Sequence, residues 1–201
     1  MLHFLANIGR KNCRKQGLFF LFFFCLFQAT PCYALSWKVL ETDYLEIYYL
    51  NEGDLESLDR NIEYGDVSSG FLGFGSSRKK GGDLKTQLAK KLDSLYTKVQ
   101  RLLDMRKKIS RVKVKVYSNK KSLLDAYFKI YGKRAEIRAW YIFEYNTVYV
   151  NAKDINEGML AHEFGHAVSD NYFGARPPRA TAEILARYID AHIHDGNAKT
   201  Y

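Results

Sequence analysis

The sequence predicts an α+β domain, and three observations lead to this class. Strict alternation of apolar and polar residues marks short strands, and apolar residues three or four positions apart mark amphipathic helices. These elements follow in the order β, long loop, α, β, α, β, β, α, α, which is typical of an α+β arrangement. The 201 residues are 47% apolar and 26% charged, a composition that can bury the core of one domain and leaves little room for a second.

The first 34 residues predict a secretory signal peptide. A basic opening at 10–15 precedes an almost unbroken apolar run at 18–27, a small-x-small sequence follows at 32–34, and no acidic residue occurs before Glu41. The apolar run is well short of the roughly 18 residues that a membrane-spanning helix needs. A short membrane anchor or a buried helix is the alternative interpretation.

Cleavage after Ala34 would send residues 35–201 to the periplasm or the outside of the cell, as a single domain with no stable membrane span. Cys13, Cys25 and Cys32 would all be removed, so the mature chain would fold without disulfides and without a thiol nucleophile or cysteine zinc ligands. The loss of four basic residues lowers the formal charge from +9 to +5, which is a modest excess.

The mature chain begins with a predicted strand, a loop and a helix. Residues 37–50 are rich in β-branched and aromatic residues and predict one strand. Residues 51–83 are polar and then glycine-rich, which predicts a long loop whose stretch 65–82 could be a lid, an inhibitory segment or a plain connection. Residues 84–103 carry leucines at helical spacing and predict an amphipathic helix.

Residues 111–117 alternate strictly and predict a strand with one buried face. Arg111, Lys113 and Lys115 would lie on its other face. We expect that face to be solvated and not to bind nucleic acid, because no matching aromatic platform accompanies the basic residues.

Another helix and two strands are predicted before the residues that carry the chemistry. Residues 118–132 have an apolar side and end at Gly132, as expected for a helix with a glycine stop. Residues 137–143 and 147–150 predict two short strands.

The next helix carries a motif with metal-binding geometry. Asp154 and Glu157 have the spacing of a capping box, which predicts that the helix begins there. His162 and His166 are one helical turn apart, so both imidazoles project from the same side and can bind one Zn²⁺. Glu163 lies one residue on, where its carboxylate would miss the ion but reach an activated water as general base. The alternative is a pair of surface histidines on an ordinary helix.

A following helix, predicted to begin near Pro177 and to run to Asp190, offers a third ligand. A catalytic zinc normally has three protein ligands and an open position. If this helix packs antiparallel to the motif helix, Glu183 would reach the ion. A solvated helix carboxylate is the alternative role for Glu183.

His162-Glu163-Phe164-Gly165-His166 followed by Glu183 resembles the gluzincin metallopeptidases, and the segment 183–188 resembles that of the bacterial peptidase-MA-like branch. Two positions differ from that family segment: Ile184 stands where the segment usually has Gly, and no Trp stands directly before Glu183. The resemblance covers about residues 84–195 in element order. It implies a small zincin-like domain, with a short mixed sheet packed on the active-site helix and a glutamate-bearing helix after it. It also implies a Zn²⁺ cofactor and a peptide or protein substrate.

The remaining candidates would support the reaction. Four side chains could stabilise the oxyanion, and the sequence does not choose among them, although we take Tyr188 as the catalytic candidate: Tyr172, Tyr188, His192 and His194. Asp170, four residues after His166 on the same helical face, could orient a ligand imidazole.

Three functions are compatible with these residues. The first is an exported zinc peptidase, and the second is an exported zinc-binding or scaffold module without turnover. The third is a basic surface-binding protein in which the motif occurs by chance. The sequence leaves cleavage preference and oligomeric state open.

Overall fold

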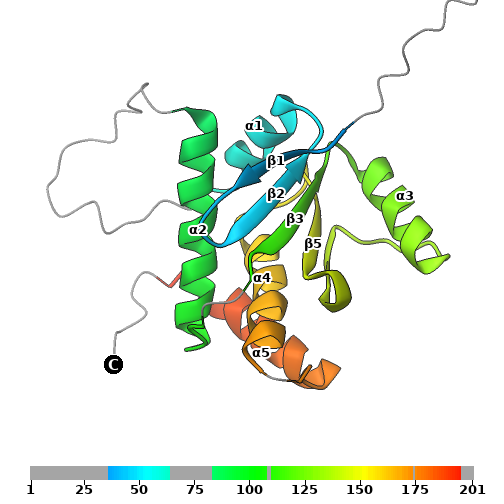
Figure 1. Cartoon of the computed structure of the whole chain (residues 1–201). Helices are drawn as coiled ribbons and strands as arrows, with labels where there is room; N and C mark the ends of the chain where they lie inside the picture. Colours follow the sequence, from blue (N-terminus) through cyan, green and yellow to red (C-terminus); the bar gives the residue numbers. More distant parts are fainter. Residues whose placement is uncertain (1–35, 64–82, 108–109, 174, 196–201) are drawn as a thin grey trace, which may run out of the picture. The chain divides into compact units, whose positions relative to one another are not determined.

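A computed structural model describes four stretches of the chain, which belong to one compact unit: residues 36–63, 83–107, 110–173 and 175–195. The predicted signal peptide and the glycine-rich stretch at 65–82 lie outside the described residues. The described stretches combine a five-stranded mixed sheet with five α-helices, which confirms the predicted α+β class (Figure 1). None of these helices is long and apolar enough to cross a membrane.

The sheet has the strand order β1-β2-β3-β5-β4. The inner pairs β2–β3 and β3–β5 are parallel, and the outer pairs β1–β2 and β4–β5 are antiparallel. The strands span Lys38–Glu41 (β1), Leu45–Tyr49 (β2), Val112–Tyr117 (β3), Ala139–Ile142 (β4) and Thr147–Asn151 (β5). The outermost strand β4 contacts the helix that carries the histidines.

Helices pack on both faces of this sheet. One face and the helices α1, α2, α4 and α5 form the main core, whereas α3 covers part of the other face through a smaller apolar cluster. The helices span Glu52–Asn61 (α1), Leu84–Leu102 (α2), Lys120–Tyr131 (α3), Glu157–Tyr172 (α4) and Arg179–His192 (α5), and a short 3₁₀ turn, η2, spans Phe143–Tyr145. Gly132 ends α3 with a φ of 66°, as predicted.

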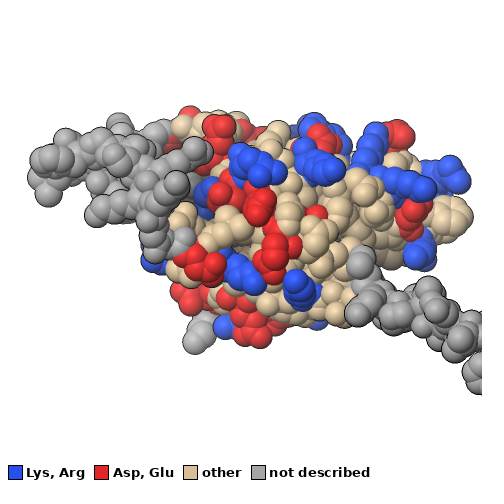
Figure 2. Space-filling view, turned by 90° about the horizontal axis from the view of Figure 1, so that it is seen from above, with Lys and Arg blue, Asp and Glu red and all other residues tan. Residues whose placement is uncertain are grey.

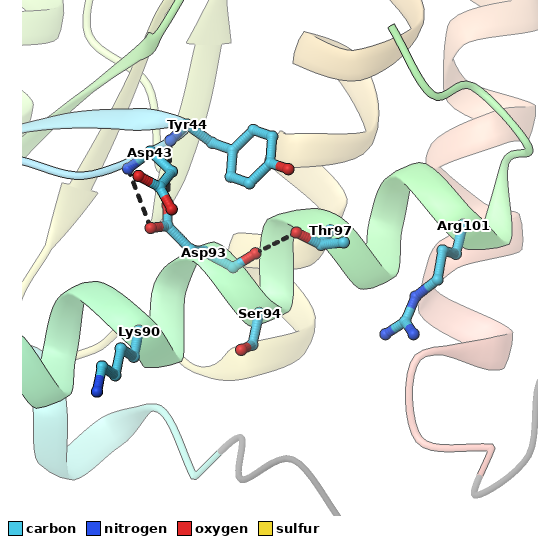
Figure 3. A pocket seen from close by; sticks show the side chains of 7 residues that line it. All are labelled: Asp43, Tyr44, Lys90, Asp93, Ser94, Thr97 and Arg101. Atoms are coloured by element: carbon cyan, nitrogen blue, oxygen red, sulfur yellow. Dashed lines mark hydrogen bonds between the residues drawn. The ribbon is translucent and has the colours of Figure 1, made fainter. Parts of the chain in front are cut away.

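Residues 37–50 form two strands, so the prediction of one continuous strand is wrong. β1 and β2 are joined by a turn whose polar groups are held by Asp93 of α2 (Figure 3). The Asp93 carboxylate accepts hydrogen bonds from Thr42 Oγ1 at 2.6 Å and from the backbone N–H of Asp43 at 3.1 Å. The turn depends on a residue about 50 positions away, which no local pattern reveals.

The predicted loop at 51–83 is also wrong in its first part, because residues 52–61 form α1. Asn51 begins this helix with a capping box: its side chain accepts from the Asp54 N–H at 3.1 Å, and the Asp54 carboxylate accepts from the Asn51 N–H at 3.2 Å. Leu55 and Leu58 bury one face of α1 in the main core. The capping pair was visible in the sequence as an Asn followed three residues later by an Asp.

The start of α4 differs from the prediction as well. Its N-cap is Asn156, whose side chain accepts from the Met159 N–H at 2.9 Å. Asp154 does not form a capping box with Glu157, because its carboxylate instead receives two hydrogen bonds from Arg138, at 2.7 and 2.8 Å.

The outer face of β3 carries aromatic neighbours that the sequence pattern did not suggest. The Lys115 Nζ lies 5.8 Å from the ring centroids of both Trp37 and Tyr149. Tyr149 is only 4% exposed because it packs in the cluster beneath α3, so its ring is not available for stacking on a base. Acidic and basic side chains are interspersed on the face shown in Figure 2. That the chain binds no nucleic acid therefore stays a prediction.

Candidate metal centre

The helices α4 and α5 approach each other closely, and this contact builds the candidate site. Gly165, inside the histidine motif, faces α5 at the point of contact. A Cβ placed on Gly165 would lie 3.4 Å from the Ala186 Cα and 3.4 Å from the Ile189 Cγ1. The absence of a side chain at Gly165 therefore lets α5 lie against the helix that carries the histidines.

The structure brings together the three residues predicted as metal ligands. The Nε2 atoms of His162 and His166 each lie 3.9 Å from a different carboxylate oxygen of Glu183. One ligand atom from each residue lies within 4.8 Å of the other two, so this group could hold a metal ion. The Glu183 side chain is 39% exposed and lies beside both histidines, so its role as a ligand stays a prediction.

The chemistry and spacing of the donors fit a divalent ion. Two imidazole nitrogens and a carboxylate oxygen are a common zinc ligand set. Donor atoms around a tetrahedral zinc with bonds of about 2.0–2.1 Å lie about 3.3–3.4 Å apart. The three donors here lie within 4.8 Å of one another, so rotations of these side chains would have to bring them closer by up to about 1.4 Å to bind one ion. All three side chains are partly exposed, so a water or a substrate can reach the centre.

Asp190 completes the centre, and the sequence reasoning assigned it no role. Its Oδ2 lies 2.9 Å from the Nδ1 of His162. A carboxylate at that position accepts the Nδ1 proton, and the Nε2 lone pair then faces Glu183 and the space for the ion. Asp190 follows Glu183 by seven residues, or two helical turns, and this spacing was the signal that both carboxylates share one face of α5.

Glu163 is part of the histidine motif, and its side chain faces the edge strand β4. Burial raises the pKa of its carboxyl to about 7, and the neighbouring Glu183 acts in the same direction. His162 and the backbone N–H of Tyr141 in β4 oppose this rise in pKa because they stabilise the charged carboxylate. A carboxyl group that changes protonation near neutral pH suits the exchange of protons with a water.

The four oxyanion candidates make their contacts elsewhere. Tyr188 is 45% exposed and stacks on the ring of His192 at 4.1 Å between centroids. Tyr172 packs edge-to-face on Phe173, and the Nδ1 of His194 lies 3.8 Å from the Glu157 carboxylate. The catalytic role of Tyr188 stays a prediction.

Asp170 does not orient a ligand imidazole. Its Oδ2 lies 3.6 Å from the Nε of Arg176, and its buried Oδ1 has no hydrogen-bond partner among the described residues. The carboxylate that contacts a candidate ligand imidazole belongs to Asp190 on the other helix.

A separate hollow of about 430 Å³ lies between the β1–β2 turn and α2, and none of the candidate metal ligands lines it. In Figure 3 the carboxylate of Asp93 turns towards the hairpin, and Lys90 and Arg101 lie at opposite ends of the hollow. The Thr97 hydroxyl donates to the Asp93 carbonyl oxygen at 2.7 Å. The Asp93 carboxylate holds the hairpin on α2, which gives this residue a structural role.

Comparisons of the chain with known protein families, with curated proteins and with solved structures found no match. The functional argument therefore depends on the geometry of the His162–His166–Glu183 cluster and its surroundings.

Proposed function

We propose that the protein is a zinc-dependent peptidase of the gluzincin type, with a small zincin-like fold. One observation carries this proposal: Glu183 from α5 places its two carboxylate oxygens 3.9 Å from the Nε2 atoms of His162 and His166 on α4. If the two histidines were ordinary surface residues, there would be no reason for a carboxylate of a second helix to lie equally close to both.

His162, His166 and Glu183 would hold the ion, and Asp190 would orient His162. A bound zinc would lower the pKa of its water to about 7 and would act as a Lewis acid on the substrate carbonyl. Three protein ligands with one accessible side are the arrangement of a catalytic rather than a structural zinc site.

Glu163 is the proposed general base. It is adjacent to His162 in the sequence and partly enclosed, and its carboxylate takes the proton of the attacking water. The same carboxyl group then gives this proton to the leaving amine, so the base is restored at the end of the reaction.

The edge strand β4 supports a peptide as the substrate. β4 is the last strand of the sheet, and the Tyr141 N–H faces Glu163 rather than β5. In an antiparallel pair the N–H and C=O of one residue point the same way, so the Tyr141 carbonyl also points away from β5. The Tyr141 N–H already faces Glu163, so an extended peptide could pair with the Tyr141 carbonyl and place its own carbonyl beside Glu163.

The test uses residues 35–201, purified, with metal content measured by mass spectrometry before and after chelation. We expect one zinc per chain, with cleavage of a peptide library that chelation abolishes and added zinc restores. Glu163→Gln should retain zinc and lose cleavage, and His162→Ala should lose both. If wild type and Glu163→Gln both bind zinc and neither cleaves, the protein is a zinc-binding module without turnover. If no stoichiometric metal binds, the proposal is wrong.

Export remains part of the proposal. A fusion of residues 1–34 to a reporter enzyme that is active only outside the cytoplasm should give activity, and deletion of the apolar run at 18–27 should abolish it. A reporter that stays inactive would show that residues 1–34 do not direct export.

A further inference from the structure

Arg176, in the connection between α4 and α5, is held in place without being hydrogen-bonded. Its guanidinium carbon lies 5.2 Å from the centroid of the Phe143 ring. Its Nε lies 3.6 Å from Asp170 and its Nη1 lies 3.6 Å from Glu144. Both separations exceed hydrogen-bond distance, and no acceptor in the described part of the chain receives a hydrogen bond from Arg176.

The two carboxylates near Arg176 differ in what they can do. The Asp170 side chain is 3% exposed, and a buried carboxylate needs a positive partner. The Glu144 side chain is 65% exposed and is free to turn into solvent. Asp170 therefore fixes the Nε side of the guanidinium, whereas Glu144 is a weaker and exposed neighbour of Nη1 on the outer side.

Arg176 lies on the same side of α4 as the proposed catalytic centre. Asp170 follows His166 by one helical turn on α4, so its partner Arg176 adjoins the face that carries the histidines. Phe143 and Glu144 continue directly from β4, the strand next to Glu163. The guanidinium is therefore at the end of the same edge strand along which a substrate would lie.

We propose that Arg176 binds a carboxylate of the substrate, so that the peptidase prefers peptides with an acidic group near the cleaved bond. This inference rests on the proposed peptidase function. The guanidinium has five N–H donors in a planar fork that matches a carboxylate, and its aromatic and acidic supports fix the orientation of that fork. Glu144 acts as an internal competitor, which the substrate carboxylate displaces.

The competitor role gives the two variants opposite effects. Arg176→Ala removes the fork, so it should lower the ratio of kcat/KM for an acidic peptide to that for its neutral analogue by about tenfold or more, as expected for a lost charge-assisted hydrogen bond. Glu144→Gln removes the competitor, so it should raise the same ratio by up to about fivefold, the range of an exposed ion pair. Arg176→Lys should fall between wild type and Arg176→Ala.

The experiment uses the zinc-loaded enzyme and a matched peptide set. Glu replaces Gln at one position at a time, and each peptide has either a free or an amidated C-terminus. Loss of preference only for the internal Glu identifies a side-chain carboxylate, and loss only for the free terminus identifies the α-carboxylate. Lys121→Glu, an exposed change on α3, is the control for charge and should leave the ratio unchanged.

A second measurement separates this inference from the peptidase proposal. Equilibrium binding of the same peptides to zinc-loaded Glu163→Gln does not require turnover. In that background Arg176→Ala should weaken binding of the acidic peptide and spare the neutral one. If Arg176→Ala weakens both peptides equally, or if Glu144→Gln and Arg176→Ala change the ratio in the same direction, then Arg176 is only a brace between α4 and β4 and the inference is wrong. Cleavage of peptides with no dependence on acidic groups would overturn it while leaving the peptidase function intact.

Discussion

Gly165 sets the distance between α4 and α5, and Gly165→Val should reduce zinc binding although Gly165 is not a ligand. The built Cβ already lies 3.4 Å from the Ala186 Cα and 3.4 Å from the Ile189 Cγ1. Each methyl group of valine reaches about 1.5 Å further, and carbon atoms prefer separations of about 3.5–4.0 Å. The helix α5 must therefore move outwards by on the order of 1–2 Å.

Glu183 and Asp190 lie on α5 on either side of this contact, so both move with the helix. Metal–ligand distances tolerate deviations of only about 0.2 Å. We expect zinc affinity to fall by at least about tenfold, as it does when ligands lose their support. Overpacking should also lower the free energy of unfolding of the metal-free protein by about 1–3 kcal/mol.

Gly158 provides the matched control in the same helix. A Cβ on Gly158 would meet only Asn156 Oδ1 at 3.7 Å, an ordinary contact. Gly158 is in the first turn of α4, so Gly158→Ala should raise the free energy of unfolding by at most about 0.5–1 kcal/mol, the helix-interior value, with zinc affinity unchanged. In Gly165→Ala the same gain is opposed by the contact at 3.4 Å, so we expect a smaller change.

The assay is urea denaturation of the metal-free variants, followed by competition with a chelator of known zinc affinity. The reasoning is refuted if Gly165→Val binds zinc within about twofold of wild type while Gly158→Ala behaves as expected, because α5 would then not need to stay close to α4.

Three further predictions concern the supports of the site and the fold. Asp190→Ala should lower zinc affinity by about 10–100-fold in the same competition assay, because the His162 Nδ1–H then has no carboxylate to hold it; an unchanged affinity would leave Asp190 without a role. Asn51→Ala should lower the free energy of unfolding by about 0.5–2 kcal/mol through loss of the α1 cap, and a urea midpoint equal to wild type would contradict it. Arg138 lowers the pKa of Asp154 through its hydrogen bonds, so this pair stabilises the fold above the usual pKa of Asp, and its contribution is lost as pH falls through the lowered value. Denaturation at pH 7 and at pH 3 should therefore show a larger loss of stability in Arg138→Ala at the higher pH, and part of the loss should remain at pH 3 because Arg138 also donates to the Asp154 carbonyl oxygen at 3.2 Å.

Elements with local causes could be predicted from the sequence. The leucines of α2 and the valines of β3 are buried as their spacing indicates, because a helix or strand repeats its faces at a fixed period. The turn of helix between His162 and His166 is also local. It places both rings on one side of α4, with their centroids 5.0 Å apart.

Elements held by distant residues could not be predicted in the same way. The turn that divides 37–50 into β1 and β2 is stabilised by Asp93 of α2. Asp154 has the spacing of a helix cap, yet its carboxylate accepts hydrogen bonds from Arg138, the residue directly before β4, and does not cap α4. In both places a tertiary partner, absent from any local window, decided the outcome.

The candidate centre combines both kinds of cause. The two histidines and Glu163 were visible in the chain because five consecutive residues of a helix contain them. The approach of Glu183 and the hydrogen bond from His162 to Asp190 arise only when α5 packs against Gly165. A helical period orders side chains within one helix, but only the packing of two helices brings a carboxylate from one of them to the imidazoles of the other.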